Sequence, residues 1–365
     1  MRPLLVYISG HGFGHAVRVC TVLRALRRAR PDVPLVLRTL IPRWFLAAEL
    51  GEPFTHGAVE LDVGAVQRDS LSLDVEATLA AATALLTDAP RRIAAEVATA
   101  RAWDPAAVFA DIPAPAFDIA AALGVPAVGM ANFSWDWIYA EYVGDRPGFA
   151  PVIAALRASY QQATVLLRLP WHGDLAAFPH VRDVPVVARI PSLVRDDVRR
   201  RLDLPVGARI ALLSFGGIGL DLARVPEVPG VTFLATQSAA ASAAPPCRFV
   251  ANAQMAAAGV RYEDLVAASD AVITKPGYGI VADCIASGTP MIYTDRGRFA
   301  EYPLLVDGIR SHLPSAFLSN ADLHAGRWRA ALDVVLDGPR RLPALDVSGA
   351  DAAAAVLAAY VAPAA

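Results

Sequence analysis

The stretch Ser9-Gly10-His11-Gly12-Phe13-Gly14-His15 follows a short apolar run, residues 4–8, and precedes a helical pattern over residues 16–30. The run LLVYI has the length and composition of a buried strand, and Pro31 stops the helix. A glycine-rich turn between a strand and a helix lets a ligand approach the backbone N–H groups at the helix N-terminus. The stretch therefore predicts a parallel α/β sheet with a ligand site at the carboxyl end of its first strand.

The alternation of short apolar runs and helical patterns continues along the chain. The first half predicts strands over 35–37, 107–110 and 127–130, and helices over 78–86, 91–102 and 116–123. The second half predicts strands over 210–213, 231–235, 271–273 and 291–293, and a helix over 280–286. Each half opens with a strand followed by a glycine-rich turn, the second turn being Ser214-Phe215-Gly216-Gly217. The predicted fold class is α/β, with two doubly wound domains that face each other across a cleft.

The domain boundaries follow from a polar, proline-punctuated stretch in the middle of the chain. We expect an N-terminal domain over 1–190, a linker over 191–205, a C-terminal domain over 206–345, and a C-terminal helix over 346–365 that could return to the N-terminal domain. The charge run over 195–201 is typical of a solvated linker or a surface helix.

Composition excludes several classes of protein. The 365 residues are 55% hydrophobic and 19% charged, with a net charge of −2, which supports a large core and gives no basic field for nucleic acid. Cys20, Cys247 and Cys284 form no CxxC pair, which excludes a zinc ribbon and a disulfide framework and indicates a reducing compartment. No apolar run reaches the roughly 18 residues of a membrane span. We expect a soluble cytoplasmic protein whose oligomeric state the sequence leaves open.

His15 is the candidate general base, because an imidazole at the carboxyl end of a strand is well placed to take a proton. Asp111, which follows a predicted strand, is its candidate partner. The alternatives are a histidine that only caps the helix and an aspartate that does the same. The G-x-G-x-G spacing differs from the dinucleotide fingerprint, which argues against NAD.

Lys275 is the only lysine of the chain, and Gly277 and Gly279 follow it just before a predicted helix. An ammonium beside a glycine turn and a helix N-terminus is typical of a phosphate site. Asp283, one turn into that helix, could accept hydrogen bonds from ribose hydroxyls. The alternative is a surface lysine, and no P-loop motif is present.

An aromatic cluster over residues 132–139 follows another predicted strand. Trp135 and its neighbours could stack on flat apolar ligand faces, or they could only pack in the core. No His, Cys, Asp or Glu group has metal-ligand spacing, so we expect no catalytic metal.

Three of these motifs carry a resemblance to a known family. Residues 10–18 (GHGFGHAVR), 132–142 (NFSWDWIYAEY) and 275–279 (KPGYG) resemble the N-terminal, glycosyltransferase-like half of L-arabinokinase, over nearly the whole chain. The kinase half of those proteins has no counterpart here, so the resemblance does not imply sugar kinase activity.

More distantly, the chain is similar to nucleotide-sugar glycosyltransferases of the GT-B type, which have two Rossmann-like domains. Their first-loop histidine corresponds to His15, the aspartate paired with it to Asp111, and an acidic residue five before a Gly-x-Pro to Asp283. Residues that contact the donor sugar fall near Glu301. Lys275 stands where many plant-type relatives have histidine, which puts their detailed donor preference in doubt.

The resemblance implies a metal-independent, inverting glycosyltransferase without a cofactor, which moves a sugar from a nucleoside diphosphate, UDP in the first instance, to a small-molecule acceptor. The N-terminal domain would bind the acceptor, and the C-terminal domain would bind the nucleotide sugar. The alternatives are a nucleotide-sugar epimerase or hydrolase on the same fold, and a non-catalytic nucleotide-sugar binding module. The implied catalytic residues are His15 and Asp111; the implied donor-binding residues are Ser214, Gly216, Gly217, Lys275, Gly277, Gly279, Asp283 and Glu301; and the implied acceptor-binding residues are His11, Gly12, Phe13, Trp135 and Asp136.

Overall fold

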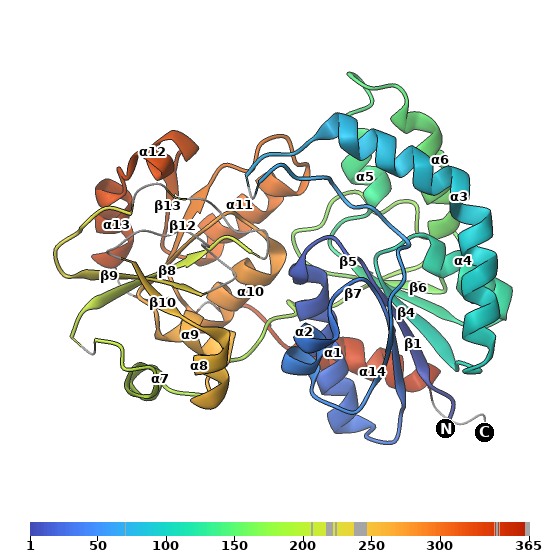
Figure 1. Ribbon diagram of the computed structural model, residues 1–365, viewed down its shortest axis with the longest axis horizontal. Helices are drawn as coiled ribbons and strands as arrows, with labels where there is room; N and C mark the ends of the chain where they lie inside the picture. Colours follow the sequence, from blue (N-terminus) through green and yellow to red (C-terminus); the bar gives the residue numbers. More distant parts are fainter. Residues whose placement is uncertain are drawn as a thin grey trace.

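Two α/β domains lie side by side in the computed structural model, each built on one parallel sheet (Figure 1). The structure describes residues 1–361 except 70, 206, 217–221, 223–224, 237–246, 339, 341 and 343. Helices cover both faces of each sheet, as a doubly wound fold requires.

The N-terminal sheet is parallel throughout. Its strands are β1 (Leu4–Ile8), β2 (Leu35–Arg38), β3 (Thr55–Gly57), β4 (Ala107–Asp111), β5 (Ala127–Ala131), β6 (Val165–Arg168) and β7 (Val181–Asp183). In the described part of the chain they are ordered β3-β2-β1-β4-β5-β6-β7. Leu4 and Val6 of β1 pack in the core on one face of the sheet, and Leu5 and Tyr7 pack in the core on the other. This alternation buries β1 completely and explains its unbroken apolar run.

The helices of this domain lie between its strands in the chain. They are α1 (Phe13–Ala29), α2 (Arg43–Leu50), α3 (Val75–Arg101), α4 (Pro115–Leu123), α5 (Trp135–Ala140) and α6 (Phe149–Tyr160). The helices predicted over 78–86 and 91–102 are a single helix, α3, with Pro90 inside it. The helix predicted from residue 16 begins at Phe13, so His15 lies in its first turn and does not precede it.

The C-terminal sheet has the same construction. Its strands are β8 (Arg209–Ser214), β9 (Val231–Thr236), β10 (Cys247–Val250), β11 (Ala271–Thr274), β12 (Met291–Thr294) and β13 (Ser315–Leu318), and their order among the described residues is β10-β9-β8-β11-β12-β13. Its helices are α8 (Asn252–Ala257), α9 (Tyr262–Ala268), α10 (Tyr278–Ser287), α11 (Glu301–His312), α12 (Asn320–Ala325) and α13 (Arg329–Leu336).

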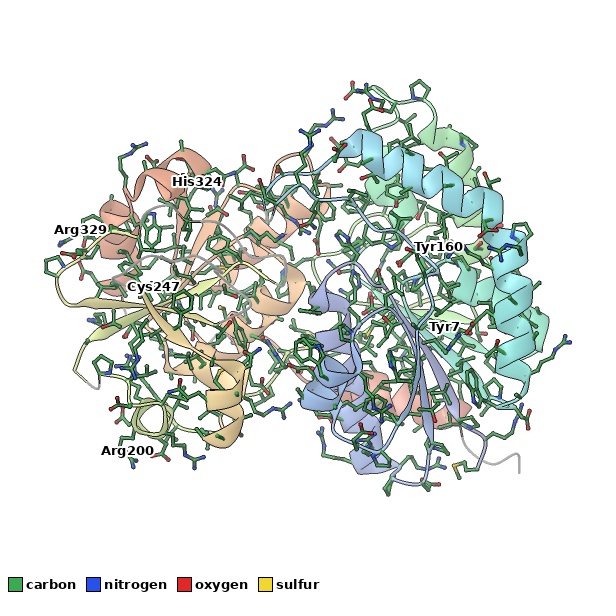
Figure 2. The ribbon with its side chains drawn as sticks, viewed as in Figure 1. Tyr7, Tyr160, Arg200, Cys247, His324 and Arg329 are labelled. Carbon is green, nitrogen blue, oxygen red and sulfur yellow. The ribbon has the colours of Figure 1, made fainter. Side chains whose placement is uncertain are left out.

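Two further helices lie outside the ranges expected for the two domains. α7 (Arg195–Arg201) lies within the predicted linker, but Val198 and Leu202 are buried in the C-terminal core, so this segment is part of that domain. Arg200 of α7 projects from the outer surface, as the charge run led us to expect (Figure 2). The last helix, α14 (Gly349–Tyr360), returns to the N-terminal domain and packs against α1 (Figure 1).

One segment of the N-terminal domain reaches across to the other domain. Residues 58–69 and 71–74, between β3 and α3, extend toward α11 and are called the arm here (Figure 1). Leu71 of the arm is buried in the C-terminal core beside Phe215. The two domains are therefore held together by apolar packing as well as by the returning helix.

Candidate functional site

A cavity of about 780 Å³ opens between the two domains where the carboxyl ends of β1, β8 and β11 meet. The N-terminal domain contributes the first turn of α1, including His15, and the C-terminal domain contributes Lys275 and the start of α10. Ten of the predicted site residues line this cavity: His11, Gly12, Phe13, His15, Ser214, Gly216, Lys275, Gly277, Gly279 and Glu301. Gly217 lies outside the described residues.

His15 lines the cavity and contacts Asp111, which lies behind the cavity wall. Ile8 of β1 is paired with Asp111 of β4, which brings the end of β4 next to the glycine turn. Asp111 is fully buried, and its Oδ1 lies 2.8 Å from Nδ1 of His15. With the Nδ1 proton donated to Asp111, Nε2 is the ring atom left to accept a proton, and the described residues form no hydrogen bond with it. This is the arrangement expected of an oriented base.

Arg18, which the sequence analysis missed, completes this pair. Its guanidinium donates to both carboxylate oxygens of Asp111, and the Nη2 to Oδ1 distance is 2.6 Å. Burial alone would raise the pKa of Asp111, but the charges of Arg18 and His15 and their hydrogen bonds outweigh burial and lower it. Asp111 is therefore held as a carboxylate. His15 and Arg18 are three residues apart in one helix, a spacing that places them on the same face and could have indicated the contact.

Arg18 also connects this pair to the other domain. Its Nη1 donates to Oδ1 of Asn132 over 2.7 Å, and Nδ2 of Asn132 donates to Oε1 of Glu301 over 2.7 Å. Arg296 donates to the second oxygen of Glu301 over 2.8 Å. Glu301 thus lines the cavity with both carboxylate oxygens already in contact with the protein.

His11 faces the same cavity but is held differently. Its Nδ1 lies 3.3 Å from the backbone N of Ala65, and its Nε2 lies 3.2 Å from Nε2 of Gln67. Burial, followed by the charges of His15, Arg296 and Lys275, lowers the pKa of His11 to about 3. Both ring nitrogens therefore have neighbours in the protein, and the ring is neutral near pH 7.

Lys275 stands at the entrance to α10. Its Nζ donates to Oε1 of Gln67 over 3.3 Å, and burial together with Arg296 lowers its pKa to about 7. Gly277, which precedes α10, has no side chain to cap the first N–H groups, and the first turn holds no acidic residue. A Cβ atom built on Gly277 or Gly279 would meet no heavy atom within 4 Å. Open space, a cation and a helix N-terminus therefore meet at one place, which suits an anionic group.

Asp283 differs from its expected place. It is 2% exposed and does not line the cavity, because its carboxylate accepts from the backbone and the guanidinium of Arg189, including Nη2 over 2.5 Å. Glu49 and Glu263, which the sequence analysis missed, do line the cavity beside Arg189. Burial raises the pKa of both, with Arg189 opposing it.

Trp135 and Asp136, expected at the acceptor, also lie behind the wall. Trp135 is 1% exposed, and its indole N–H donates to Asp62 over 2.9 Å. Asp136 accepts from Ser134 and from Arg157. Phe133 is the member of this cluster that reaches the cavity, with its ring 5.7 Å from that of His15.

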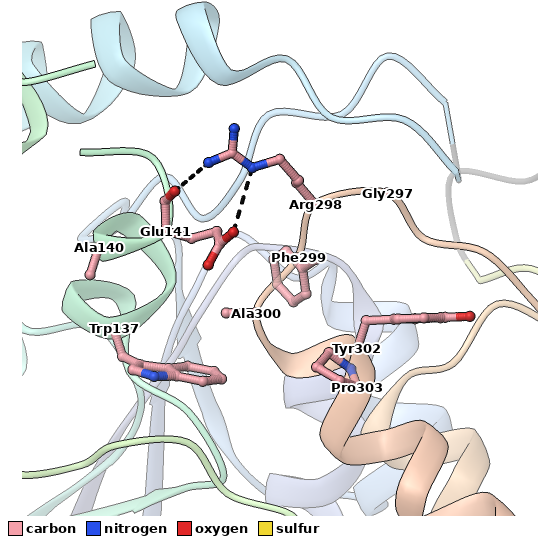
Figure 3. Close-up of a pocket in the computed structure, with 9 residues that line it drawn as sticks. All are labelled: Trp137, Ala140, Glu141, Gly297, Arg298, Phe299, Ala300, Tyr302 and Pro303. Carbon is pink, nitrogen blue, oxygen red and sulfur yellow. Dashed lines mark hydrogen bonds and ion pairs between the residues drawn. The ribbon is translucent and has the colours of Figure 1, made fainter. Parts of the chain in front are cut away.

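A second cavity, of about 510 Å³, lies between α5 and the segment before α11. Trp137, Phe299 and Tyr302 line it, and Arg298 contacts Glu141 at its rim (Figure 3). Of the predicted site residues that the structure describes, none lines this cavity. The ring of Phe133 contacts His15 on one side and Phe299 on the other.

No three His, Cys, Asp or Glu side chains in the described ranges come together as ligands of a metal ion would. Among the helices that the structure describes, none is long and apolar enough to span a membrane.

The sequence of this chain is similar to that of a known enzyme. The chain is 32% identical to the N-terminal part of an L-arabinokinase from Arabidopsis thaliana over 334 residues, which are 90% of this chain and 31% of that protein. The chain thus spans about a third of the length of that relative. No family model matches the chain.

Solved structures with similar folds are glycosyltransferases. The calicheamicin glycosyltransferase CalG4 matches with a TM-score of 0.61 and 13% identity, over 100% of both chains. Phytolacca americana UGT2, solved with UDP-2-fluoro-glucose and pterostilbene, matches with a TM-score of 0.56 and 13% identity, over 98% of this chain and 94% of that one. Identities this low show the fold alone. The chain therefore has the GT-B fold of two Rossmann-like domains, and its sequence is similar to the N-terminal part of L-arabinokinase.

Proposed function

We propose that the protein is a metal-independent glycosyltransferase that moves a sugar from a nucleoside diphosphate, most simply UDP, to a small hydroxyl-bearing acceptor. The observation that carries the proposal is the meeting of two half-sites in one cavity. An oriented imidazole faces it from the N-terminal domain, and a cation with a helix N-terminus faces it from the C-terminal domain.

The donor half follows from the charge at α10. A diphosphate leaving group develops negative charge, which a pre-formed positive site stabilises without reorganisation. Lys275 and the N–H groups at the start of α10 supply that site, and the glycines at 277 and 279 leave room for it. UGT2 in its solved form binds a UDP-sugar analogue, which supports UDP as the first donor to test.

The acceptor half follows from Nε2 of His15, with which no described residue forms a hydrogen bond. In the proposed reaction the acceptor O–H gives its proton to Nε2 of His15, and its oxygen attacks the anomeric carbon of the donor. The bond from that carbon to the diphosphate oxygen breaks, and its electron pair leaves with the nucleoside diphosphate. A single displacement of this kind inverts the anomeric centre. Asp111 and Arg18 hold the ring during proton transfer.

A second candidate is a nucleotide-sugar binding module without turnover. The similarity to L-arabinokinase favours it, because the chain matches 31% of a larger protein that is named as a kinase and not as a glycosyltransferase. The two candidates share the donor half of the site and differ in whether His15 acts as a base.

The test is incubation with UDP-sugars in the presence and absence of a panel of hydroxyl acceptors, with products read by mass spectrometry. The proposal expects UDP release only with an acceptor, together with an acceptor mass increased by one sugar. UDP release in water alone would indicate hydrolysis, and an interconverted sugar would indicate epimerisation. A thermal shift with UDP-sugars but no product in any condition would favour the binding module.

A further inference from the structure

One buried chain of contacts links the expected base to the opposite domain. It runs from His15 through Asp111, Arg18 and Asn132 to Glu301, and each of the five residues is at most 6% exposed. The first four residues belong to the N-terminal domain, and Glu301 belongs to the C-terminal domain. Neither donor nor acceptor chemistry requires such a chain, so its function has to be sought elsewhere.

The inference rests on the proposed function, in which His15 is the base. We propose that Arg18 and Asn132 are positioning residues, which align the His15–Asp111 pair only when the two domains are together. Arg18 is the central member, because it contacts Asp111 with two nitrogens and Asn132 with the third.

Arg18 contacts both the ring of His15 and the carboxylate that orients it. Two of its nitrogens donate to the oxygens of Asp111, and its Nη2 lies 3.1 Å from Nδ1 of His15. The position of the guanidinium therefore decides where the carboxylate, and with it the ring, is held.

The dependence on closure follows from what holds Arg18 in place. Asn132 is fixed between Arg18 and Glu301, and the guanidinium of Arg18 lies 5.4 Å from the ring centre of Tyr278, the first residue of α10. Separation of the domains removes both Glu301 and Tyr278 from this arrangement. Arg18 would then keep Asp111 as its charged partner but lose the contacts that fix its orientation.

The experiment follows the seven histidines of the full chain by NMR after labelling with ¹⁵N-histidine, with His15→Gln used to assign His15. The test variants are Arg18→Met and Asn132→Leu. The matched control is Arg38→Met, because Arg38 is also mostly buried in the N-terminal domain and paired with a carboxylate, Glu96, but does not line the cavity.

In Arg18→Met we expect the His15 signals, recorded at one pH, to move from their wild-type positions and to broaden, because the ring loses its fixed orientation against Asp111. Asn132→Leu should shift them in the same direction in the presence of Arg18 and have no effect in the Arg18→Met background. It should also lower kcat by at least tenfold with little change in KM for the donor. Arg38→Met should leave the His15 signals in place.

Unchanged His15 signals in a folded Arg18→Met or Asn132→Leu variant would overturn the inference, as would an equal shift in Arg38→Met. If Arg18→Met does not fold, the His15 signals of Asn132→Leu are compared with those of wild type, and that comparison tests the inference. The NMR measurement needs no turnover. If the wild-type protein transfers no sugar, the proposed function is refuted. The NMR result would still show whether Arg18 and Asn132 position His15.

Discussion

The Nζ atom of Lys275 in the C-terminal domain donates a hydrogen bond of 3.3 Å to Oε1 of Gln67, which belongs to the arm of the N-terminal domain. Gln67 is neutral, and no carboxylate among the described residues forms an ion pair with the ammonium, which therefore has no counter-charge in direct contact in that part of the chain. A diphosphate would provide one. A bound diphosphate would therefore replace this hydrogen bond between the two domains.

Lys275→Ala should weaken UDP binding by about 1.5–3 kcal/mol, the range for a hydrogen bond to a charged group. The reason is the loss of the cation beside the N-terminus of α10. Isothermal titration calorimetry measures the effect, and Lys275→Arg serves as the control because it keeps the charge. Unchanged UDP affinity in a folded Lys275→Ala protein would show that the phosphates bind elsewhere.

UDP binding should take up a proton above neutral pH. Burial lowers the pKa of Lys275 to about 7, so the free protein is mostly neutral there at pH 8 and mostly charged at pH 6. Because UDP favours the ammonium, affinity should fall as pH rises through 7. Calorimetry at pH 8 in two buffers of different ionisation enthalpy should show the uptake in wild type and none in Lys275→Arg. Equal heats in the two buffers for wild type would speak against a charged Lys275 in the complex.

Gly279→Ala should weaken UDP binding without lowering the thermal stability of the protein. Gly279 is the second residue of α10, and alanine favours a helix over glycine by up to about 1 kcal/mol. The added Cβ meets no protein atom within 4 Å, but it enters the space assigned to the phosphates. We expect a melting temperature equal to or above wild type and a UDP affinity at least tenfold weaker. Gly144→Ala, which also adds a Cβ in open space but lies outside the cavity, should leave affinity unchanged.

Transfer activity should survive chelation. The proposed positive charge at the leaving group comes from Lys275 and from the N-terminus of α10. Initial rates measured with and without excess EDTA should agree. Complete loss of activity that manganese or magnesium restores would contradict this part of the account.

The strand and turn pattern predicted the architecture because each parallel strand is buried on both faces and reads as an apolar run. It also predicted that the turn at Gly12 and the turn at Gly277 would share one cavity, since both follow strand ends at the cleft. The helix boundaries were less accurate. The two helices predicted over 78–86 and 91–102 are one helix, α3, which continues through Pro90.

The contacts between domains could not be predicted. Asn132 and Glu301 are 169 positions apart and belong to different domains, so only the packing of the two domains brings them together. Asp283 matches a family position, but Arg189, from the segment between the domains, binds its carboxylate. Trp135 is an aromatic residue near a strand end, and sequence alone does not tell packing from binding at such a place.

The central claim is that the base and the donor site lie in different domains and can be separated by mutation. The most direct test measures the transfer rate and the UDP affinity of His15→Ala, with His11→Ala as the matched control and thermal melting to confirm folding. The account predicts a loss of roughly 10²–10⁴ in rate for His15→Ala, the usual contribution of a general base, with UDP affinity near that of wild type. Full turnover in His15→Ala, with activity abolished only in His11→Ala, would contradict it.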